Sequence, residues 1–146
     1  MNTLLVMAQI AGRRCAIEAP NVDAVIEIGA ITPVPRTPEY ISGITAMRSQ
    51  ALTVIDARTA LGFDQTAFPV DHRAIVASLN GDLYAFRVDI IEDVCTAMSE
   101  PETVPGGFGE GWTQVSPGLV ETRVGPALLL NLSALLCPAK PFEAAA

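Results

Sequence analysis

Short apolar stretches separated by turn-forming residues run along the whole chain, and this pattern predicts a protein made of β-strands. Residues 4–9 are mostly apolar, and residues 14–19 alternate between apolar and polar side chains. Alternation with a period of two is typical of a strand that buries one face. The Gly12-Arg13 turn between the two stretches therefore predicts a hairpin.

The segment that follows is predicted to leave the sheet. A proline interrupts the alternation, and the next residue, Asn21, is placed to cap a short helical turn that aligns Val22, Val25 and Ile26 on one face. Residues 28–38 contain three prolines. Because proline cannot donate to a strand ladder, this stretch is expected to be an extended loop.

A second hairpin and a helical turn come next. Residues 43–48 and 51–55 are predicted strands joined by a two-residue turn. Asp56 then stands where its side chain can cap a one-turn helix over residues 57–61, and Gly62 can end that helix.

The same order of elements returns in the second half. Residues 73–79 and 82–88 are predicted strands around Asn80-Gly81, which is a strong signal for a two-residue hairpin turn. The remaining predicted elements are a short, partly amphipathic segment at 89–94, strands at 119–123 and 127–130, and a last helical turn capped by Asn131.

An internal repeat relates the two halves. Shifted by seventy-five residues, the stretch 42–62 falls on 117–137 without a gap. This register aligns Gly43 with Gly118, Arg48 with Arg123, Leu61 with Leu136, and the two predicted helix caps Asp56 and Asn131. Shifted by sixty-nine residues, the stretch 16–25 falls on 85–94, and Val25 meets Val94. Identity is low in both registers, so the repeat rests on the matching apolar positions and caps.

The repeat predicts an all-β fold of two similar units, each with about five short strands and a final helical turn. Such short strands are best protected in small closed barrels, because closure removes unpaired edges. We expect two barrels packed along an apolar seam with a groove between them. The predicted organisation is one domain over residues 1–140, with two interleaved subdomains, an approximate repeat of 14–62 and 83–137, and a flexible tail at 141–146.

Composition narrows the classes of function. The net charge is −7, which argues against a nucleic-acid binder and against a protein that docks on anionic lipid, because both need a cationic surface. The longest apolar stretch, residues 126–139, is shorter than the ~20 residues that span a bilayer. The three cysteines, Cys15, Cys95 and Cys137, are far apart and odd in number, which favours a reducing cytoplasm and buried thiols.

The chain offers little catalytic or metal-binding chemistry. His72 is the only histidine and is interpreted as a surface residue. Asp89, Glu92 and Asp93 form a cluster without other metal ligands nearby, and are interpreted as one solvated face. We therefore predict no catalytic residue, no cofactor and no metal.

The glycine-rich loop at 99–111 leaves an enzyme as an alternative. The stretch "GGFGEGW" at 106–112 fails as a dinucleotide fingerprint, because no strand precedes it, no helix follows it and its third glycine is misplaced. A catalytic site here would depend on three acidic residues, Glu100, Glu102 and Glu110. Phe108 and Trp112 border the loop, either as interface anchors or as residues that pack it down.

Four segments, in order and spacing, resemble the CheW family, the coupling adaptors of bacterial chemosensory arrays. They are "NVDAVIEI" (21–28), "PRTPEYISGITAMRSQALTVIDARTALG" (35–62), "YAFRVDIIEDV" (84–94) and "ALLLNLSALL" (127–136). The resemblance implies two SH3-like five-stranded β-barrels packed side by side. It also implies a non-enzymatic cytoplasmic adaptor that is peripheral to membrane-bound receptor arrays and oligomeric only within such an array.

The resemblance implies two protein partners and a set of contact residues. One surface would hold the regulatory domain of a CheA-type histidine kinase, and the groove between the barrels would hold the cytoplasmic tip of a chemoreceptor. Glu27 and Arg48 match the family's acidic residue and its arginine, and are expected either to shape this surface or to be a plain ion pair or two solvated charges. The other predicted contact residues are Val25, Ile28, Gly43, Ile44 and Val88, for which core packing or backbone geometry is the alternative.

The chain departs from the family pattern around its arginine. Ala46 and Ser49 stand where the family has asparagine and glycine, and Thr53 replaces a proline. Serine at a position that favours a positive φ either strains the turn or changes it. An alternative function is therefore a divergent regulator or decoy that binds the kinase without receptors, or an adaptor of a pilus-type pathway.

Overall fold

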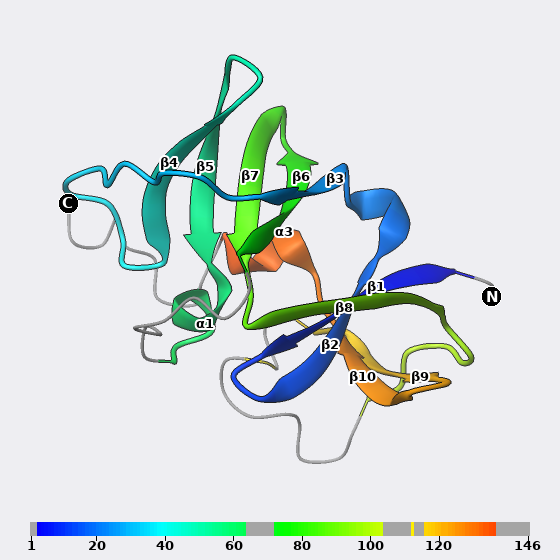
Figure 1. Ribbon diagram of the computed structural model, residues 1–146. Coiled ribbons are helices and arrows are strands. Elements are labelled where there is room, and N and C mark those ends of the chain that lie inside the picture. The colour runs from blue at the N-terminus through cyan, green and yellow to red at the C-terminus, as the bar shows by residue number, and fades with distance from the viewer. Residues whose placement is uncertain (1–2, 64–71, 104–111, 113–115, 137–146) are drawn as a thin grey trace.

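Two five-stranded sheets form the protein (Figure 1). The structure is a computed structural model that describes residues 3–63, 72–103, 112 and 116–136. Sheet A has the strand order β8-β1-β2-β10-β9, and sheet B has the order β3-β6-β7-β5-β4. The all-β class predicted from the sequence is confirmed.

The elements follow the predicted hairpins closely. The strands are β1 (Leu4–Ile10), β2 (Arg13–Glu18), β3 (Ala24–Glu27), β4 (Ile41–Met47), β5 (Gln50–Asp56), β6 (Arg73–Leu79), β7 (Asp82–Arg87), β8 (Ile90–Thr96), β9 (Gly118–Thr122) and β10 (Gly125–Leu129). The helical turns are η1 (Ala19–Asn21), α1 (Ala57–Ala60) and α3 (Leu132–Leu135).

Neither sheet is built from one half of the chain. Sheet A joins the hairpin β1-β2 of the first half to β8, β9 and β10 of the second. Sheet B joins the hairpin β6-β7 of the second half to β3, β4 and β5 of the first. In Figure 1 the lower sheet accordingly mixes blue strands with green and orange ones. The sequence repeat is real in the fold, but its two units exchange their first hairpins.

The core has three parts, and the inner strands are buried on both faces. In β1, Leu5 and Met7 belong to a cluster formed by strands of sheet A alone. Val6, Ala8 and Ile10 belong to a central cluster between the two sheets. Burial on both faces explains why β1 reads as an almost continuous apolar run. A third cluster, with Leu52, Val54, Ala74, Val76 and Ala85, lies within sheet B.

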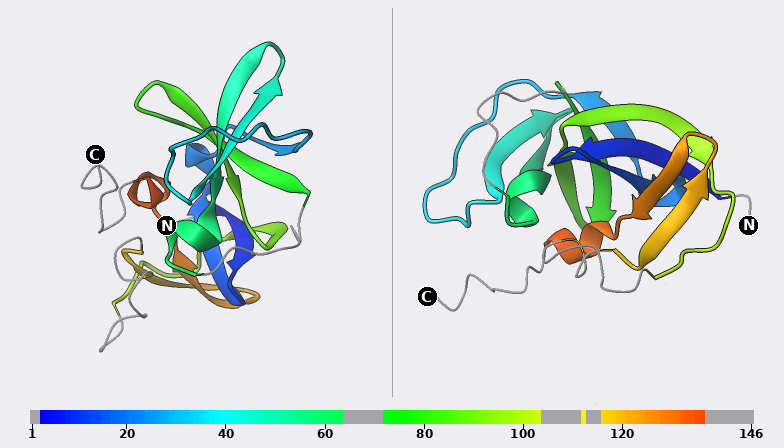
Figure 2. Two further views of the ribbon diagram at one scale, coloured as in Figure 1. Left: turned by 90° about the vertical axis from the view of Figure 1, so that its left-hand side faces the viewer. Right: turned by 90° about the horizontal axis from the view of Figure 1, so that it is seen from below.

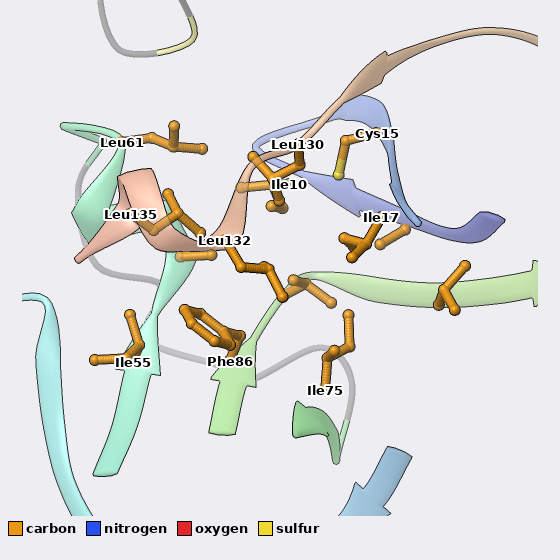
Figure 3. Packing of buried hydrophobic residues seen from close by; sticks show 14 of the residues in the cluster. Ile10, Cys15, Ile17, Ile55, Leu61, Ile75, Phe86, Leu130, Leu132 and Leu135 are labelled. Carbon is orange, nitrogen blue, oxygen red and sulfur yellow. The ribbon is translucent and has the colours of Figure 1, made fainter. Parts of the chain in front are cut away.

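The central cluster fills the seam between the two sheets. Residues from both sheets and from α1 and α3 converge there, including Ile17, Ile55, Phe86 and Leu135 (Figure 3). The further views in Figure 2 show α1 and α3 at the junction. Among the described residues, the apolar seam predicted between the two units is therefore observed.

One local prediction was wrong, because a strand was read as part of a helical turn, and a second strand lies in a segment to which the sequence assigned no element. Residues 24–27 form β3 and pair with β6, whereas the only helical turn nearby is η1, which ends at Asn21. Residues 90–96 form β8, which pairs with β1. Each segment is a lone strand next to a hairpin from the other half of the chain, and the ladder it completes outweighs local propensity.

The predicted helix caps and the Asn80-Gly81 turn are confirmed, whereas the turn predicted at Gly12-Arg13 is formed one residue earlier, by Ala11 and Gly12. Asp56 Oδ1 accepts hydrogen bonds from the backbone N–H of Arg58 and Thr59, and Asn131 Oδ1 accepts one from Ser133. Asn80 and Gly81 have φ angles of +55° and +88°, as a two-residue hairpin turn requires.

The β4–β5 turn has the same geometry without a glycine. Arg48 and Ser49 have φ angles of +51° and +72°. A left-handed conformation costs a non-glycine residue on the order of 1 kcal/mol. Of the two outcomes expected for Ser49, the structure therefore shows the strained turn.

The paired glycines of the repeat mark where each sheet curls and closes. Thr32 bridges Ile44 beside Gly43, and Glu102 bridges Leu119 beside Gly118. A Cβ on Gly43 would lie 2.3 Å from the Thr32 carbonyl oxygen, and one on Gly118 would lie 2.9 Å from the Glu102 nitrogen. Both positions therefore need glycine because another backbone passes directly over them.

Candidate partner-binding surface

Four of the seven predicted contact residues are exposed and lie along the two end strands of sheet B. Val25 and Glu27 belong to β3, Ile44 belongs to β4, and Arg48 lies in the turn after β4. Val25 is 40% exposed and Ile44 is 39% exposed, although both are large apolar side chains. The segment between the two strands crosses over β7 and β5 and pairs Thr32 with Ile44 (Figure 1).

Strand alternation places these side chains outward. In β3, Ala24 and Ile26 pack against the core of sheet B, so Val25 and Glu27 point away from it. In β4, the residues on either side of Ile44 are buried, and Ile44 itself faces solvent. Each end strand of sheet B therefore exposes one apolar side chain, Val25 on β3 and Ile44 on β4. A charged residue lies close to each of them in the sequence.

Glu27 and Arg48 do not form an ion pair. Glu27 Oε2 lies 3.7 Å from Nε2 of His72, and the two side chains are 79% and 71% exposed. Arg48 is exposed at the tip of the β4–β5 hairpin. The alternative of an ion pair between Glu27 and Arg48 is therefore excluded, and the surface position expected for His72 is confirmed.

The other three predicted contact residues contribute mainly to the fold. Val88 is only 6% exposed and belongs to the central cluster, so it does not line an open groove. Ile28 is half-buried against the core of sheet B. Gly43 is buried and serves the close approach of Thr32. For these residues the alternative of packing or backbone geometry fits the structure.

Asp89 and Glu92 are not part of one solvated face, which corrects our interpretation of that cluster. Asp89 Oδ2 accepts hydrogen bonds from the Ala11 backbone N–H at 2.9 Å and from Arg58 Nη1 at 3.2 Å. Its side chain is 17% exposed. Asp89 thus ties α1 to the β1–β2 turn. Asp93 is the exposed member of the cluster.

Glu92 makes a second polar tie, between side chains of neighbouring strands of sheet A. It accepts from Arg14 Nε at 3.1 Å and from Gln9 Nε2 at 3.0 Å, while Arg14 Nη1 donates to the Val124 carbonyl at 2.9 Å. The hydrogen bond from Arg14 lowers the pKa of Glu92 below its ordinary value, and Glu92 raises the pKa of Arg14. This group of contacts joins β1, β2, β8 and the β9–β10 turn.

We expect the Glu92 ion pair to make stability fall at acidic pH. The pKa of Glu92 is lowered from 4.5 by folding, so its contribution is present above pH 4.5 and is lost as the pH falls through the folded-state value. Between pH 7 and pH 3, the urea midpoint of Glu92→Gln should therefore decline less than that of the unmodified chain. Asp93→Asn removes one negative charge from the same strand and is the matched control. Equal acid slopes for Glu92→Gln and the unmodified chain would contradict this prediction.

Other candidate chemistry is buried or outside the described residues. Cys15 and Cys95 are buried free thiols, as expected, and burial raises the pKa of Cys15, whereas Cys137 lies outside the described residues. Trp112 is 3% exposed in the central cluster, with the Arg13 guanidinium 5.8 Å from its ring centroid. Of the two alternatives for Trp112, packing against the core therefore fits the structure. Phe108 lies outside the described residues.

The enzyme alternative gains no support from the described part of its loop. Glu100 and Glu102 are exposed, and the other acidic residue, Glu110, lies outside the described residues. A cavity of about 120 Å³ beside Ser99 is lined by Glu18 and Glu100 among others. This volume is below the ~300 Å³ of typical ligand sites. Across residues 3–63, 72–103, 112 and 116–136, no group of three or more His, Cys, Asp or Glu side chains is arranged to hold a metal ion.

Comparison with known proteins identifies the family. The family model described as the CheW-like domain matches residues 4–138. The chain belongs to the CheW-like domain family. A crystal structure titled as the scaffolding protein TtCheW from Thermoanaerobacter tengcongensis superposes on it with a TM-score of 0.81, at 24% identity and over 92% of both chains. This likeness supports the fold, in which two SH3-like subdomains fit the two sheets.

Curated relatives of this chain include a protein named for chemotaxis. The chain is 32% identical to the chemotaxis protein CheW of Rhizobium meliloti over 79 residues, which are 52% of this chain and 51% of the relative. It is 38% identical to the protein FrzA of Myxococcus xanthus over 48 residues, which are 33% of this chain and 30% of the relative. The chain thus spans about half the length, or less, of the curated relatives it matches. Among its described helices, none is long and apolar enough to cross a membrane.

Proposed function

We propose that this CheW-like domain is a non-enzymatic cytoplasmic adaptor that couples a CheA-type histidine kinase to chemoreceptors. Membership of the family supports this proposal, as do the curated chemotaxis relatives and the fold it shares with a scaffolding protein. The proposal needs protein-binding surfaces and no cofactor.

The observation that carries the proposal is the exposed surface on the end strands of sheet B. Val25 and Ile44 expose apolar area, and Glu27 and Arg48 add charge around it. The strand β3 has one neighbour in the sheet order, so its other edge offers backbone groups and alternating side chains to a partner, whereas Ile44 of β4 already pairs with Thr32. The regulatory domain of a CheA-type kinase is itself CheW-like, so it carries equivalent edges. We therefore assign this surface of β3, β4 and the β4–β5 turn to the kinase.

Replacing Arg48 by alanine tests this assignment. Arg48→Ala should weaken binding of the purified kinase regulatory domain by ~10-fold or more, as expected for an arginine at the centre of an interface. Isothermal titration calorimetry measures the affinity, and circular dichroism checks that the fold is kept. Arg123→Ala is the matched control, because Arg123 is the exposed repeat partner of Arg48 on the other sheet. A folded Arg48→Ala protein with unchanged affinity for the kinase regulatory domain would remove Arg48 from the kinase interface.

A second candidate function is a regulator that binds the kinase but not receptors. The burial of Val88 favours it, because Val88 was expected to line the groove that holds the receptor tip. The strained turn at Ser49, where the family has glycine, is a second departure. Separate pull-downs with the kinase regulatory domain and with a receptor hairpin distinguish the two functions. Binding of both partners supports the adaptor, and binding of the kinase alone selects the regulator.

A further inference from the structure

The exchange of hairpins leaves each half of the chain without a sheet of its own. The first half holds β1–β5 and α1, and the second holds β6–β10 and α3. Within the first half, the only strand neighbours in the sheets are β1 with β2 and β4 with β5. Within the second half they are β6 with β7 and β9 with β10. An isolated two-stranded hairpin is marginally stable at best in water, so neither half has the strands for an independent fold.

All the ladders that build the hairpins into sheets join one half to the other. They are β1 with β8, β2 with β10, β3 with β6, and β5 with β7. The strands β3 and β8 have no neighbour in the sheet order except a strand of the other half. Figure 1 shows the consequence, because β3 and β8 each lie along a hairpin from a distant part of the chain.

Side-chain contacts also join the two halves. The central cluster brings Ile10 and Ile17 of the first half against Phe86 and Leu132 of the second (Figure 3). Two ion pairs also cross between the halves, since Arg58 binds Asp89 and Arg14 binds Glu92. The boundary between the halves therefore has the composition of an obligate protein interface, with an apolar centre and paired charges.

We propose that each half of this chain is a complete binding partner for the other half, so that the two assemble without a covalent connection through residues 64–71. The contacts just described involve residues on both sides of that connection, and none of them requires the connection itself. A separate polypeptide with the complementary half of this same sequence is the partner that fits each surface. By the same contacts, a second copy of the chain can supply a missing half.

Cleavage of the folded chain tests the proposal. A protease site inserted between Ala67 and Phe68 allows the native protein to be cut into two fragments. The fragments should stay together in size-exclusion chromatography, and after separation in urea they should regain the original circular dichroism spectrum only when mixed. The melting temperature of the cut protein should rise with concentration, whereas that of the intact chain should not. Fragments that separate after cutting, a melting temperature independent of concentration, or cooperative unfolding of either fragment by itself would each overturn the proposal.

Two variants of the second fragment show whether association uses the native ladders. Ala85 is fully buried in β7 opposite Val54 of β5, across the boundary between the halves. Ala85→Asp should reduce association with the first fragment at least 100-fold. Ser78→Asp, on the exposed face of β6, is the matched control and should associate within about threefold of the unmodified fragment. Equal association of the two variants would overturn the proposal.

Discussion

Gly43→Ala is expected to lower the free energy of unfolding by about 2–4 kcal/mol, from the combined cost of a clash and backbone strain. The new Cβ would lie 2.3 Å from the carbonyl oxygen of Thr32 and 2.9 Å from the Ile31 side chain. Because φ at Gly43 is +148°, the alanine would also hold an unfavourable backbone conformation. Relief of the contact requires the segment that closes sheet B to move away from β4.

Two other glycines provide graded controls for this measurement. Gly29→Ala should change stability by less than ~0.5 kcal/mol, since nothing lies within 4 Å of its Cβ position. Gly118→Ala should be intermediate, because its Cβ would meet Glu102 at 2.9 Å without the unfavourable φ. Urea unfolding followed by circular dichroism gives all three values. A Gly43→Ala protein as stable as Gly29→Ala would show that the close approach of Thr32 is not required.

Phe86→Ala is expected to cost about 3–5 kcal/mol, as is usual when a large buried aromatic side chain is removed. Phe86 is fully buried in the central cluster, to which both sheets, α1 and α3 contribute. The cavity would therefore weaken both sheets together, and unfolding should remain a single transition. The only tryptophan, Trp112, belongs to the same cluster and reports on it directly.

The test compares two probes of unfolding in urea. Fluorescence of Trp112 follows the central cluster, and far-ultraviolet circular dichroism follows the strands. In Phe86→Ala both should shift to lower urea by the same amount, whereas Val25→Ala, at a 40% exposed position, should scarcely move either. Two separated transitions would mean that the sheets unfold independently, and a loss below ~1 kcal/mol would mean that the cluster repacks around the missing ring.

Features that depend on a few neighbouring residues could be predicted from the sequence. The turn at Asn80-Gly81 follows from residue types that tolerate a positive φ, and the caps at Asp56 and Asn131 follow from short polar side chains before a helical turn. The repeat was also visible, because equivalent places in the two sheets require the same apolar register. The lone strand β3 was missed, since its only ladder lies with a strand about fifty residues away.

The sequence identified some of the exposed residues of the candidate surface but could not tell them from buried ones. Val25, Glu27, Ile44 and Arg48 are exposed, as a contact role requires, whereas Val88 is buried. In a strand covered on both faces, each apolar residue looks alike in the sequence whether it meets a core or a partner. Exposure therefore has to be read from the neighbouring elements. The same ambiguity led Asp89 and Glu92 to be read as solvated, although their arginine partners are Arg58 and Arg14, far away in the chain.

Residue types and spacing thus account for the hairpins, the caps, the paired glycines and the family of this chain. Pairing of the hairpins into sheets has a different origin. The hairpins of the two repeats carry the same apolar register, so nothing local distinguishes an exchange of β1-β2 and β6-β7 from two sequential sheets. Packing of Phe86, Ile17 and their neighbours into one central cluster, together with the parallel ladders of β2 with β10 and β5 with β7, selects the exchanged arrangement. Those contacts form only when both halves of the chain are present, because each half supplies the surface on which the other folds.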